Sequence, residues 1–168
     1  SGTVTEFPIP TADSDPWGIA AGPDGNLWFT EKEGNKIGRI TPSGTITEFS
    51  LPTAAAGPAG IAAGPDGRMW FTENEVNAIG RIATGGAITE FPIPSPGASP
   101  QGITPGPDGA LWFTEHGANK IGRITTAGAI TNEFPIPTPV SAPQGIAPGP
   151  DGSLWFTEFN ANQIGRIT

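Results

Sequence analysis

Short runs in which apolar and polar residues alternate follow one another along the chain, separated by Gly, Pro, Asn and Asp. One representative stretch predicts four β-strands, at residues 60–63, 69–72, 78–82 and 87–93. The first two are joined by the turn Gly64-Pro65-Asp66-Gly67, in which Pro presets φ at the first central position and Gly closes the turn. The second strand, Met-Trp-Phe-Thr, is apolar on both faces, so its sheet must be covered on both sides.

The same four-strand pattern occurs four times along the chain. Three motifs mark each copy: Gly-Pro-Asp-Gly at 22–25, 64–67, 106–109 and 149–152, Trp-Phe-Thr-Glu at 28–31, 70–73, 112–115 and 155–158, and Ile-Gly-Arg-Ile at 37–40, 79–82, 121–124 and 164–167. Their spacing is 42 residues, or 43 where Asn132 is inserted. Residues 1–168 therefore divide into four repeats within one domain, at 1–42, 43–84, 85–126 and 127–168.

A period of about 40–45 residues with several short strands per unit is typical of β-propeller blades. Helix-pair repeats have a similar period, but the frequent Gly and Pro exclude long helices. The Gly60-Ile61-Ala62 strand is small enough for the crowded axis of a propeller, whereas Pro in the fourth strand suits a sheet edge because it lacks a ladder N–H. The prediction is an all-β propeller with four four-stranded blades per chain, whose strands run from axis to rim in sequence order.

The two ends of the chain predict how the ring closes. The sequence begins with an outer-type strand, from Val4 to Ile9, and ends with a third-type strand, from Ile164 to Ile167. An open arc of blades would expose apolar sheet faces and an unpaired edge. We therefore expect a homodimer that forms one eight-bladed ring, in which each N-terminal strand completes the last blade of the other copy. A closed four-bladed monomer and a fragment of a longer chain are the alternatives.

The composition excludes several classes of function. The chain has no Cys, which excludes disulfides, thiolate metal sites and cysteine nucleophiles. A net charge of −8 without Lys/Arg clusters argues against nucleic acid as a partner. No apolar run approaches the ~18–20 residues of a membrane helix. We expect a soluble protein, and the start at Ser1 without a signal-peptide pattern indicates a mature form or a fragment.

One long motif carries a family resemblance. The string Pro-x-Gly-Ile-x-x-Gly-Pro-Asp-Gly-x-Leu/Met-Trp-Phe-Thr-Glu, followed by Asn-x-Ile-Gly-Arg-Ile, resembles the streptogramin B lyase (virginiamycin B lyase) family over all 168 residues. The resemblance implies single-chain propellers of seven blades, about 51° apart. It also implies an Mg²⁺-assisted elimination that opens an ester of a cyclic streptogramin without hydrolytic water. It further implies that the chemistry uses a His at the x of Pro-x-Gly-Ile and the Glu of Trp-Phe-Thr-Glu.

The residues at the family's His position differ here. The four equivalent positions hold Trp17, Ala59, Gln101 and Gln144. None of these side chains titrates near pH 7, as a general base should. The chain's one histidine, His116, follows Glu115 in the loop after the second strand. This loop is predicted at the same rim of the propeller as the four equivalent positions, which makes His116 a candidate substitute base. The alternative is a solvated loop residue.

The Glu position is kept in every repeat. The four glutamates are candidate catalytic residues if the protein is a lyase, and they are Glu31, Glu73, Glu115 and Glu158. Around one mouth of the channel, joined by Asp13 and Asp15, their carboxylates would suit Mg²⁺ or Ca²⁺, and their mutual repulsion would raise some of their pKa values. The alternative is that each Glu caps its strand end, accepting loop N–H groups or pairing with Lys or Arg.

Further residues on the same rim are candidates for binding a small-molecule ligand. Trp17 and Phe159 break the pattern of their equivalents, and they either pack against a neighbouring loop or form a stacking surface to which Gln101 and Gln144 add hydrogen bonds. The Trp of each Trp-Phe-Thr-Glu is predicted to be core. Arg of the third strand and Glu of the fourth are predicted to form cross-strand ion pairs, the set being Arg39, Arg81, Arg123, Arg166, Glu6, Glu48, Glu90 and Glu133.

Two classes of function follow from these residues. The first is a non-catalytic propeller, a scaffold or a binding module with an acidic channel rim, because the family's His is absent. The alternative is a divergent Mg²⁺-dependent streptogramin B lyase, which opens a cyclic depsipeptide by carbon–oxygen elimination.

Overall fold

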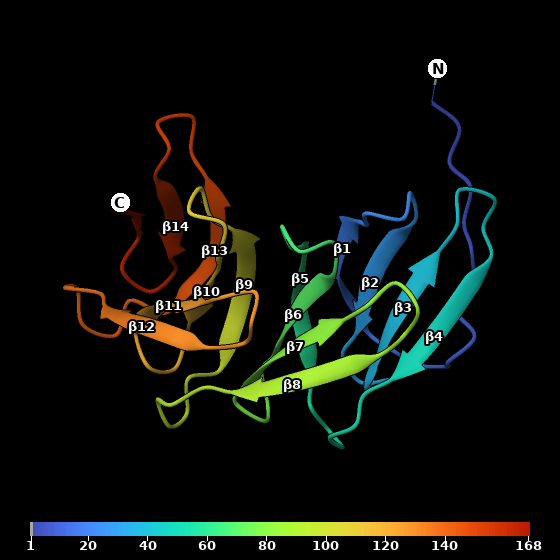
Figure 1. Ribbon diagram of the computed structural model, residues 1–168, viewed down its shortest axis with the longest axis horizontal. Coiled ribbons are helices and arrows are strands. Elements are labelled where there is room, and N and C mark those ends of the chain that lie inside the picture. The colour runs from blue at the N-terminus through green and yellow to red at the C-terminus, as the bar shows by residue number, and fades with distance from the viewer. Residues whose placement is uncertain (1) are drawn as a thin grey trace.

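The computed structural model describes residues 2–168 and is built from β-strands, turns and loops, as predicted (Figure 1). Its strands form four separate antiparallel sheets, which we call blades 1 to 4. Blade 1 contains β1 (Pro16–Ala21), β2 (Leu27–Glu31), β3 (Lys36–Ile40) and β4 (Ile46–Ser50). Blade 2 contains β5 (Pro58–Ala63), β6 (Met69–Glu73), β7 (Ala78–Ile82) and β8 (Ile88–Pro92).

Blades 3 and 4 repeat this plan, with one strand fewer in blade 4. Blade 3 contains β9 (Pro100–Pro105), β10 (Leu111–Glu115), β11 (Lys120–Ile124) and β12 (Ile130–Pro135). Blade 4 contains β13 (Pro143–Pro148), β14 (Leu154–Glu158) and β15 (Gln163–Ile167). No helix among the described residues is long and apolar enough to cross a membrane.

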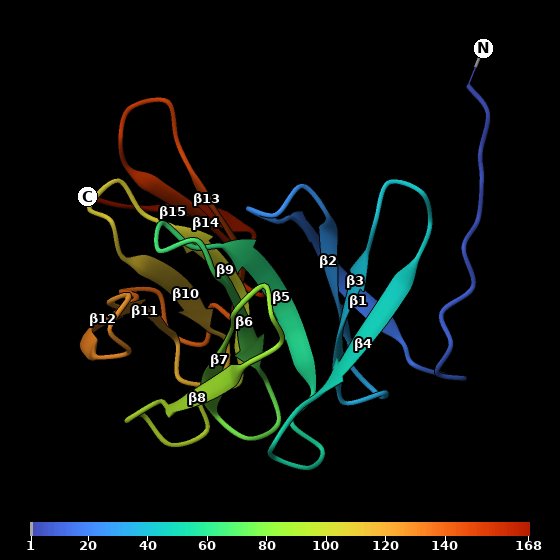
Figure 2. The same ribbon diagram turned by 45° about the vertical axis from the view of Figure 1, so that its right-hand side comes forward.

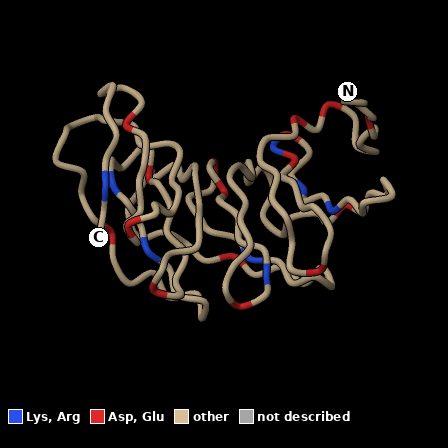
Figure 3. The backbone as a smooth tube through the Cα atoms, turned by 90° about the horizontal axis from the view of Figure 1, so that it is seen from above, with Lys and Arg blue, Asp and Glu red and all other residues tan. Residues whose placement is uncertain are grey.

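Strand order within each blade follows the chain. The first strands of successive blades, β1, β5, β9 and β13, contact one another and are therefore innermost, which confirms the predicted order from axis to rim. Seen from above, the blades form an open arc (Figure 3). The blades are out of phase with the sequence repeats, because each complete blade takes its outermost strand from the start of the next repeat.

The hydrophobic core lies between blades. Trp28 of blade 1 packs with Met69 and Phe71 of blade 2, and equivalent clusters join blade 2 to blade 3 and blade 3 to blade 4. The predicted core tryptophans Trp28, Trp70 and Trp112 are buried, whereas Trp155 is partly exposed. Both faces of the second strand are apolar because each inner blade is covered on both sides by its neighbours.

Within a blade, aromatic stacking and one hydrogen bond hold each Trp in place. The indole of Trp70 stacks on Phe91 of β8 with ring centroids 5.6 Å apart. Its Nε1 donates to Asp66 Oδ1 of the Gly-Pro-Asp-Gly turn at 3.0 Å. Gly80 pairs with Phe71 across β6 and β7, and a Cβ on Gly80 would lie 2.1 Å from the Phe71 ring. The Gly of Ile-Gly-Arg-Ile is therefore required by the Phe beside it.

Adjacent blades also meet through their innermost backbones. Thr72 Oγ1 accepts from Gly60 N at 2.9 Å and donates to Gln101 O of the next blade at 2.8 Å. A Cβ on Gly60 would lie 2.3 Å from that carbonyl oxygen, so only Gly allows the two strands to approach this closely. The Thr and Gly of the motifs thus set the spacing of the blades.

The N-terminal segment differs from the prediction. Residues 4–9 were expected to form a strand, but they run beside blade 1 without strand pairing (Figure 2). A strand needs a neighbouring ladder, and the sheet that lacks an outer strand, blade 4, is at the other end of the arc.

The predicted Arg–Glu ion pairs between third and fourth strands are wrong. Arg123 Nε instead donates to Asp108 Oδ2 of the turn at 2.7 Å. Arg81 lies over Trp70 and Phe91, 5.3 and 5.2 Å from their ring centroids, and donates to Thr126 O of the next blade. The guanidinium planes stack on the aromatic pair, which a sequence register cannot reveal.

Candidate functional site: the axial channel

The innermost strands of all four blades surround one hollow of about 580 Å³. Each blade contributes the Gly and Ile of its Pro-x-Gly-Ile segment, and blades 1, 3 and 4 also contribute the x residue. The lining residues are Trp17, Gly18, Ile19, Gly60, Ile61, Gln101, Gly102, Ile103, Gln144, Gly145 and Ile146. This hollow is the axial channel, and it contains three of the four predicted ligand-binding residues.

An irregularity in the ladder lies beside the x residue of every blade, and in blades 1, 3 and 4 this residue is on the channel wall. In blade 3, Pro100 pairs with Glu115 and Ile103 with Phe113, and the register shifts between these pairs. The backbone carbonyl of Gln101 accepts from Thr72 of blade 2, while its side chain lines the channel. A bulge of this kind is a common way to aim a side chain out of a sheet.

The structure separates Phe159 from the other predicted ligand-binding residues. Trp17, Gln101 and Gln144 line the channel together, and the ammonium of Lys32 lies 5.5 Å from the centroid of the Trp17 ring. Phe159 lines a different depression, beside Glu158 at the end of blade 4. The channel wall thus combines one aromatic surface with two amides.

His116 lies half-buried in the loop after β10. The equivalent residue of blade 2, Asn74, donates from Nδ2 to Pro100 O, the first residue of the next innermost strand. His116 is the residue at this position in blade 3, where the next innermost strand begins with Pro143 and Gln144. The predicted substitute base is not among the residues that line the hollow.

The four motif glutamates do not form the expected ring of carboxylates. Each is buried at the end of its second strand, and they are Glu31, Glu73, Glu115 and Glu158. Both carboxyl oxygens of Glu31, Glu73 and Glu115, and Oε2 of Glu158, are buried without a hydrogen-bond partner. None of the four glutamates forms an ion pair with Lys or Arg among the described residues. Among residues 2–168 no group of three His, Asp or Glu is placed to hold a metal ion, and Asp13 and Asp15 add none. Figure 3 shows the acidic residues spread along the arc.

Three of these buried glutamates lie beside a second carboxyl group from the outermost strand of the same blade. Burial, and then the neighbouring Glu90, raise the pKa of Glu73 to about 8. Burial and the nearby Glu133 likewise raise the pKa of Glu115 to about 8. In blade 1, burial and Glu48 raise the pKa of Glu31 to about 7. Burial and a neighbouring carboxylate both disfavour the charged form of each motif Glu, so these groups bind their protons more tightly than exposed carboxyls do.

These pairs do not fit the Mg²⁺ that the family resemblance implies. Mg²⁺ requires near-octahedral oxygen ligands and retains several waters. A Cβ on Gly80 would lie 2.7 Å from Glu73 Oε1, so this carboxyl points into the blade, away from solvent. The sequence analysis assigned the second members, Glu48, Glu90 and Glu133, to ion pairs with Arg. Their recurrence directly before a Phe was the available signal that they occupy equivalent places in each blade.

Comparison with known proteins decides the family. The sequence profile of the virginiamycin B lyase family matches residues 1–168. The chain belongs to the virginiamycin B lyase family. Virginiamycin B lyase of Bacillus licheniformis is 56% identical over 40 residues, which cover 24% of this chain and 14% of that protein.

Solved virginiamycin B lyases match the whole arc. The selenomethionine-substituted enzyme from Staphylococcus aureus is 55% identical, with a TM-score of 0.97, over 99% of this chain and 57% of that one. A catalytically inactive His-to-Ala variant of the same enzyme, with quinupristin, matches equally well. The chain thus spans a little over half the length of these enzymes.

Proposed function

We propose that this chain forms part of a virginiamycin B lyase-type site, in which the axial channel binds a streptogramin B and the ester of its ring is opened by carbon–oxygen elimination. The observation that carries the proposal is the channel wall itself. It is built from Gly and Ile of every blade and from the x residues Trp17, Gln101 and Gln144, in an arc that superposes with a TM-score of 0.97 on a lyase whose structure was solved with quinupristin.

The wall offers complementary surfaces to a cyclic depsipeptide. Trp17 presents an exposed indole on which an aromatic or proline ring can stack. Gln101 and Gln144 each carry an amide donor and acceptor for ester and amide groups. The rest of the wall is Gly and Ile, which lets a bulky apolar ring approach the backbone.

Elimination needs a group that removes a proton from the carbon next to the one that carries the leaving ester oxygen, so that a carbon–carbon double bond forms, and His116 is the chain's one imidazole. By equivalence with Asn74 of blade 2, which contacts the start of the next innermost strand, we expect it beside the start of β13, next to Gln144. The imidazole takes the proton as the C–O bond breaks, and the released carboxylate leaves with the bonding pair. No water is consumed, so the linear product is an isomer of the cyclic substrate.

A second candidate is binding without turnover. It is favoured by one specific observation: no channel-lining position carries a His, and Trp17, Gln101 and Gln144 do not ionise near pH 7. This candidate predicts the same ligand and the same wall residues.

The test is incubation of the protein with quinupristin, with Mg²⁺ or with EDTA, followed by liquid chromatography and mass spectrometry. A linear isomer of unchanged mass supports the lyase, and His116→Ala should abolish it while leaving binding intact. A product heavier by one water would show hydrolysis and contradict elimination. Binding that weakens in Trp17→Ala, without any product, would replace the lyase by the second candidate. Absence of binding would overturn both candidates. Val140→Ser changes an exposed residue outside the channel, so it is the control for the channel variants and should bind and react as the wild type does.

A further inference from the structure

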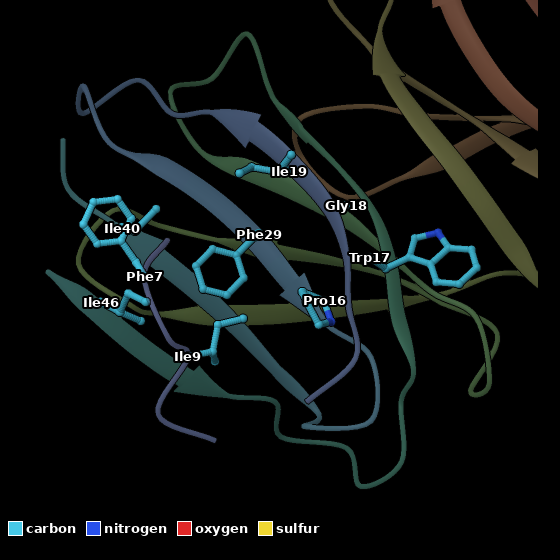
Figure 4. A pocket seen from close by; sticks show the side chains of 9 residues that line it. All are labelled: Phe7, Ile9, Pro16, Trp17, Gly18, Ile19, Phe29, Ile40 and Ile46. Carbon is cyan, nitrogen blue, oxygen red and sulfur yellow. The ribbon is translucent and has the colours of Figure 1, made fainter. Parts of the chain in front are cut away.

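The two carboxyl groups enclosed in blade 1 share one face of the sheet with a lysine. Figure 4 shows Phe29 of β2 and Ile46 of β4 on this face. Side chains alternate between the two faces of a strand, so Glu31 and Glu48, each two residues further on, lie on the same face. Lys36 of β3 is paired directly with Glu31 and therefore shares it. The sheet thus gathers two carboxyl groups and one ammonium group.

The ammonium group of Lys36 is bound by a carboxylate and a hydroxyl. It donates to Glu48 Oε2 at 3.2 Å and to the hydroxyl of Thr11, in the segment before β1. Burial and Glu48 raise the pKa of Glu31, and the charge of Lys36 opposes them. A single positive charge is therefore accommodated between the two carboxyl groups of blade 1.

Blade 3 places an ammonium group at the same position. Lys120, the equivalent of Lys36, donates to Ser95 Oγ. The backbone N–H of Ser95 donates to Glu133 Oε1 at 3.1 Å, which keeps the hydroxyl beside the carboxyl pair. Burial and Glu133 raise the pKa of Glu115, and the charge of Lys120 opposes this effect. Two blades thus bring a cation to the carboxyl pair by equivalent contacts.

Blade 2 has the carboxyl pair but no lysine. Ala78 is paired with Glu73 as Lys36 is paired with Glu31, and its side chain ends at Cβ. Among the described residues, no Lys or Arg forms an ion pair with Glu73 or Glu90. Burial and then Glu90 raise the pKa of Glu73, and no positive charge opposes them. The protein's own side chains therefore leave this pair uncompensated.

Glu73 is a fully buried carboxyl group without a hydrogen-bond donor. Its side chain is 0% exposed, and neither of its oxygens has a hydrogen-bond partner among residues 2–168. Gly80 allows the carboxyl to lie against the backbone of β7, beside Glu90, because a Cβ there would be 2.7 Å from Oε1. Buried polar groups are nearly always paired, so an unpaired carboxyl at this depth points to a bound partner.

Glu90 and Thr53 supply the other oxygen atoms around this position. Thr53 donates to Glu90 from its backbone N at 3.1 Å and from Oγ1 at 2.6 Å. Glu90 accepts with both carboxyl oxygens, as an ionised carboxylate does. Thr53 is the equivalent of Ser95, whose hydroxyl accepts from a lysine in blade 3. Glu90 is half-buried and Thr53 is exposed, so a small ion can reach the pair from solvent.

We propose that blade 2 binds a monovalent cation, Na⁺ or K⁺, between the carboxyl groups of Glu73 and Glu90 and the hydroxyl of Thr53, where blades 1 and 3 place a lysine ammonium. A single charge matches the ammonium that it replaces. Ca²⁺ takes about 6–8 oxygen ligands and Mg²⁺ demands octahedral geometry, which two carboxyl groups and one hydroxyl do not supply. None of these residues lines the axial channel, so the site is independent of the proposed function.

Thermal unfolding in different salts tests the proposal. The protein is melted at pH 9, where protons compete least for the pair, in NaCl, KCl or choline chloride of equal ionic strength. Na⁺ or K⁺ should raise the melting temperature by about 3–5 °C for each tenfold increase above half-saturation, and choline should not. Equal melting temperatures in all three salts would overturn the proposal in favour of a shared proton. Stabilisation by Ca²⁺ alone would overturn the monovalent assignment.

Ala78→Lys gives blade 2 the lysine that blades 1 and 3 carry. This variant should melt above the wild type in choline chloride and should lose the dependence on Na⁺ and K⁺, which also shows that it is folded. Ala87→Lys adds the same charge at an exposed position of the same blade and should keep the dependence. Loss of the dependence in Ala87→Lys would attribute the effect to net charge and overturn the proposal.

Anomalous scattering locates the ion. Crystals of the protein soaked in a rubidium or thallium(I) salt should show an anomalous peak in contact with Glu73 and Glu90, and crystals of Ala78→Lys should lack it. Peaks confined to other places in wild-type crystals would overturn the proposal.

Discussion

The carboxyl groups of Glu73 and Glu90 lie next to each other inside blade 2, and burial together with this neighbour raises the pKa of Glu73 to about 8. Glu115 and Glu133 repeat the arrangement in blade 3. The protein therefore contains carboxyl groups with raised pKa values that are enclosed in its sheets and do not line its channel.

Stability should fall as the pH rises. The unfolded-state pKa of Glu73 is near 4.5 and its folded-state pKa is higher, so the folded chain binds more protons between these values. The contribution is complete below pH 4.5 and is lost as the pH rises through about 8. Urea unfolding between pH 5 and pH 9 should show this decline.

The same series on Glu73→Gln should decline less, because Gln is neutral throughout and can donate to Glu90. Glu75→Gln, whose side chain is 57% exposed, is the control and should follow the wild type. A wild-type free energy of unfolding that increased from pH 5 to pH 8 would refute the buried carboxyl pairs.

Gly60→Ala should destabilise the fold, because the new Cβ would lie 2.3 Å from Gln101 O across the blade junction. Forcing a methyl group into a filled space costs about 1–3 kcal/mol. Gly85→Ala meets nothing within 4 Å and should change the free energy of unfolding by less than about 0.5 kcal/mol. Thermal denaturation of the two variants is sufficient, and equal melting temperatures would contradict the close approach.

Thr72→Val should weaken the contact between blades 2 and 3 while preserving side-chain shape. It leaves Gly60 N and Gln101 O without their partner, at a cost of about 1–3 kcal/mol for a buried unsatisfied group. Thr89→Val, on the exposed side of β8, is the matched substitution and should be nearly neutral. Chemical denaturation distinguishes them, and an equally mild effect of both would count against the Thr bridge.

Asp108→Asn should destabilise the turn of blade 3 above pH 4. Burial raises the pKa of Asp108, but hydrogen bonds from Trp112 and Arg123 outweigh it and hold the pKa below 3.8. The charge thus contributes stability above pH 3.8 that is lost as the pH falls through the folded-state pKa. The expected loss at pH 7 is about 1 kcal/mol. Asp13→Asn, an exposed carboxylate, should leave the unfolding midpoint unchanged.

Periodic features of this protein could be predicted from the sequence. The repeat, the strands and their order follow from motifs whose Gly, Pro and alternation have direct geometric causes. The equivalence of Trp17, Gln101 and Gln144 follows from their shared position in the Pro-x-Gly-Ile motif. The sequence could not show which neighbouring side chains the charged residues of adjacent strands would contact. Arg81 stacks on Trp70 in place of pairing with Glu90, and Glu73 turns inward toward Glu90.

The expected N-terminal strand illustrates the other limit. Val4 to Ile9 has the pattern of an outer strand, yet a strand exists only where a neighbour supplies a hydrogen-bonding ladder. The sequence pattern shows only that residues 4–9 could pair as a strand. Whether they do depends on whether an unpaired strand edge lies close enough to hydrogen-bond with them.

Because Thr72, Gly60 and Gln101 form the same bridge that their equivalents form at the other junctions, no blade is specialised for its position along the arc. Unequal recombination that inserted or removed one repeat would place every residue opposite the same kind of neighbour as before. Propellers with different numbers of blades could then arise by gene duplication without passing through a form whose blades pack poorly. The channel wall would then diversify mainly through changes in the x residues.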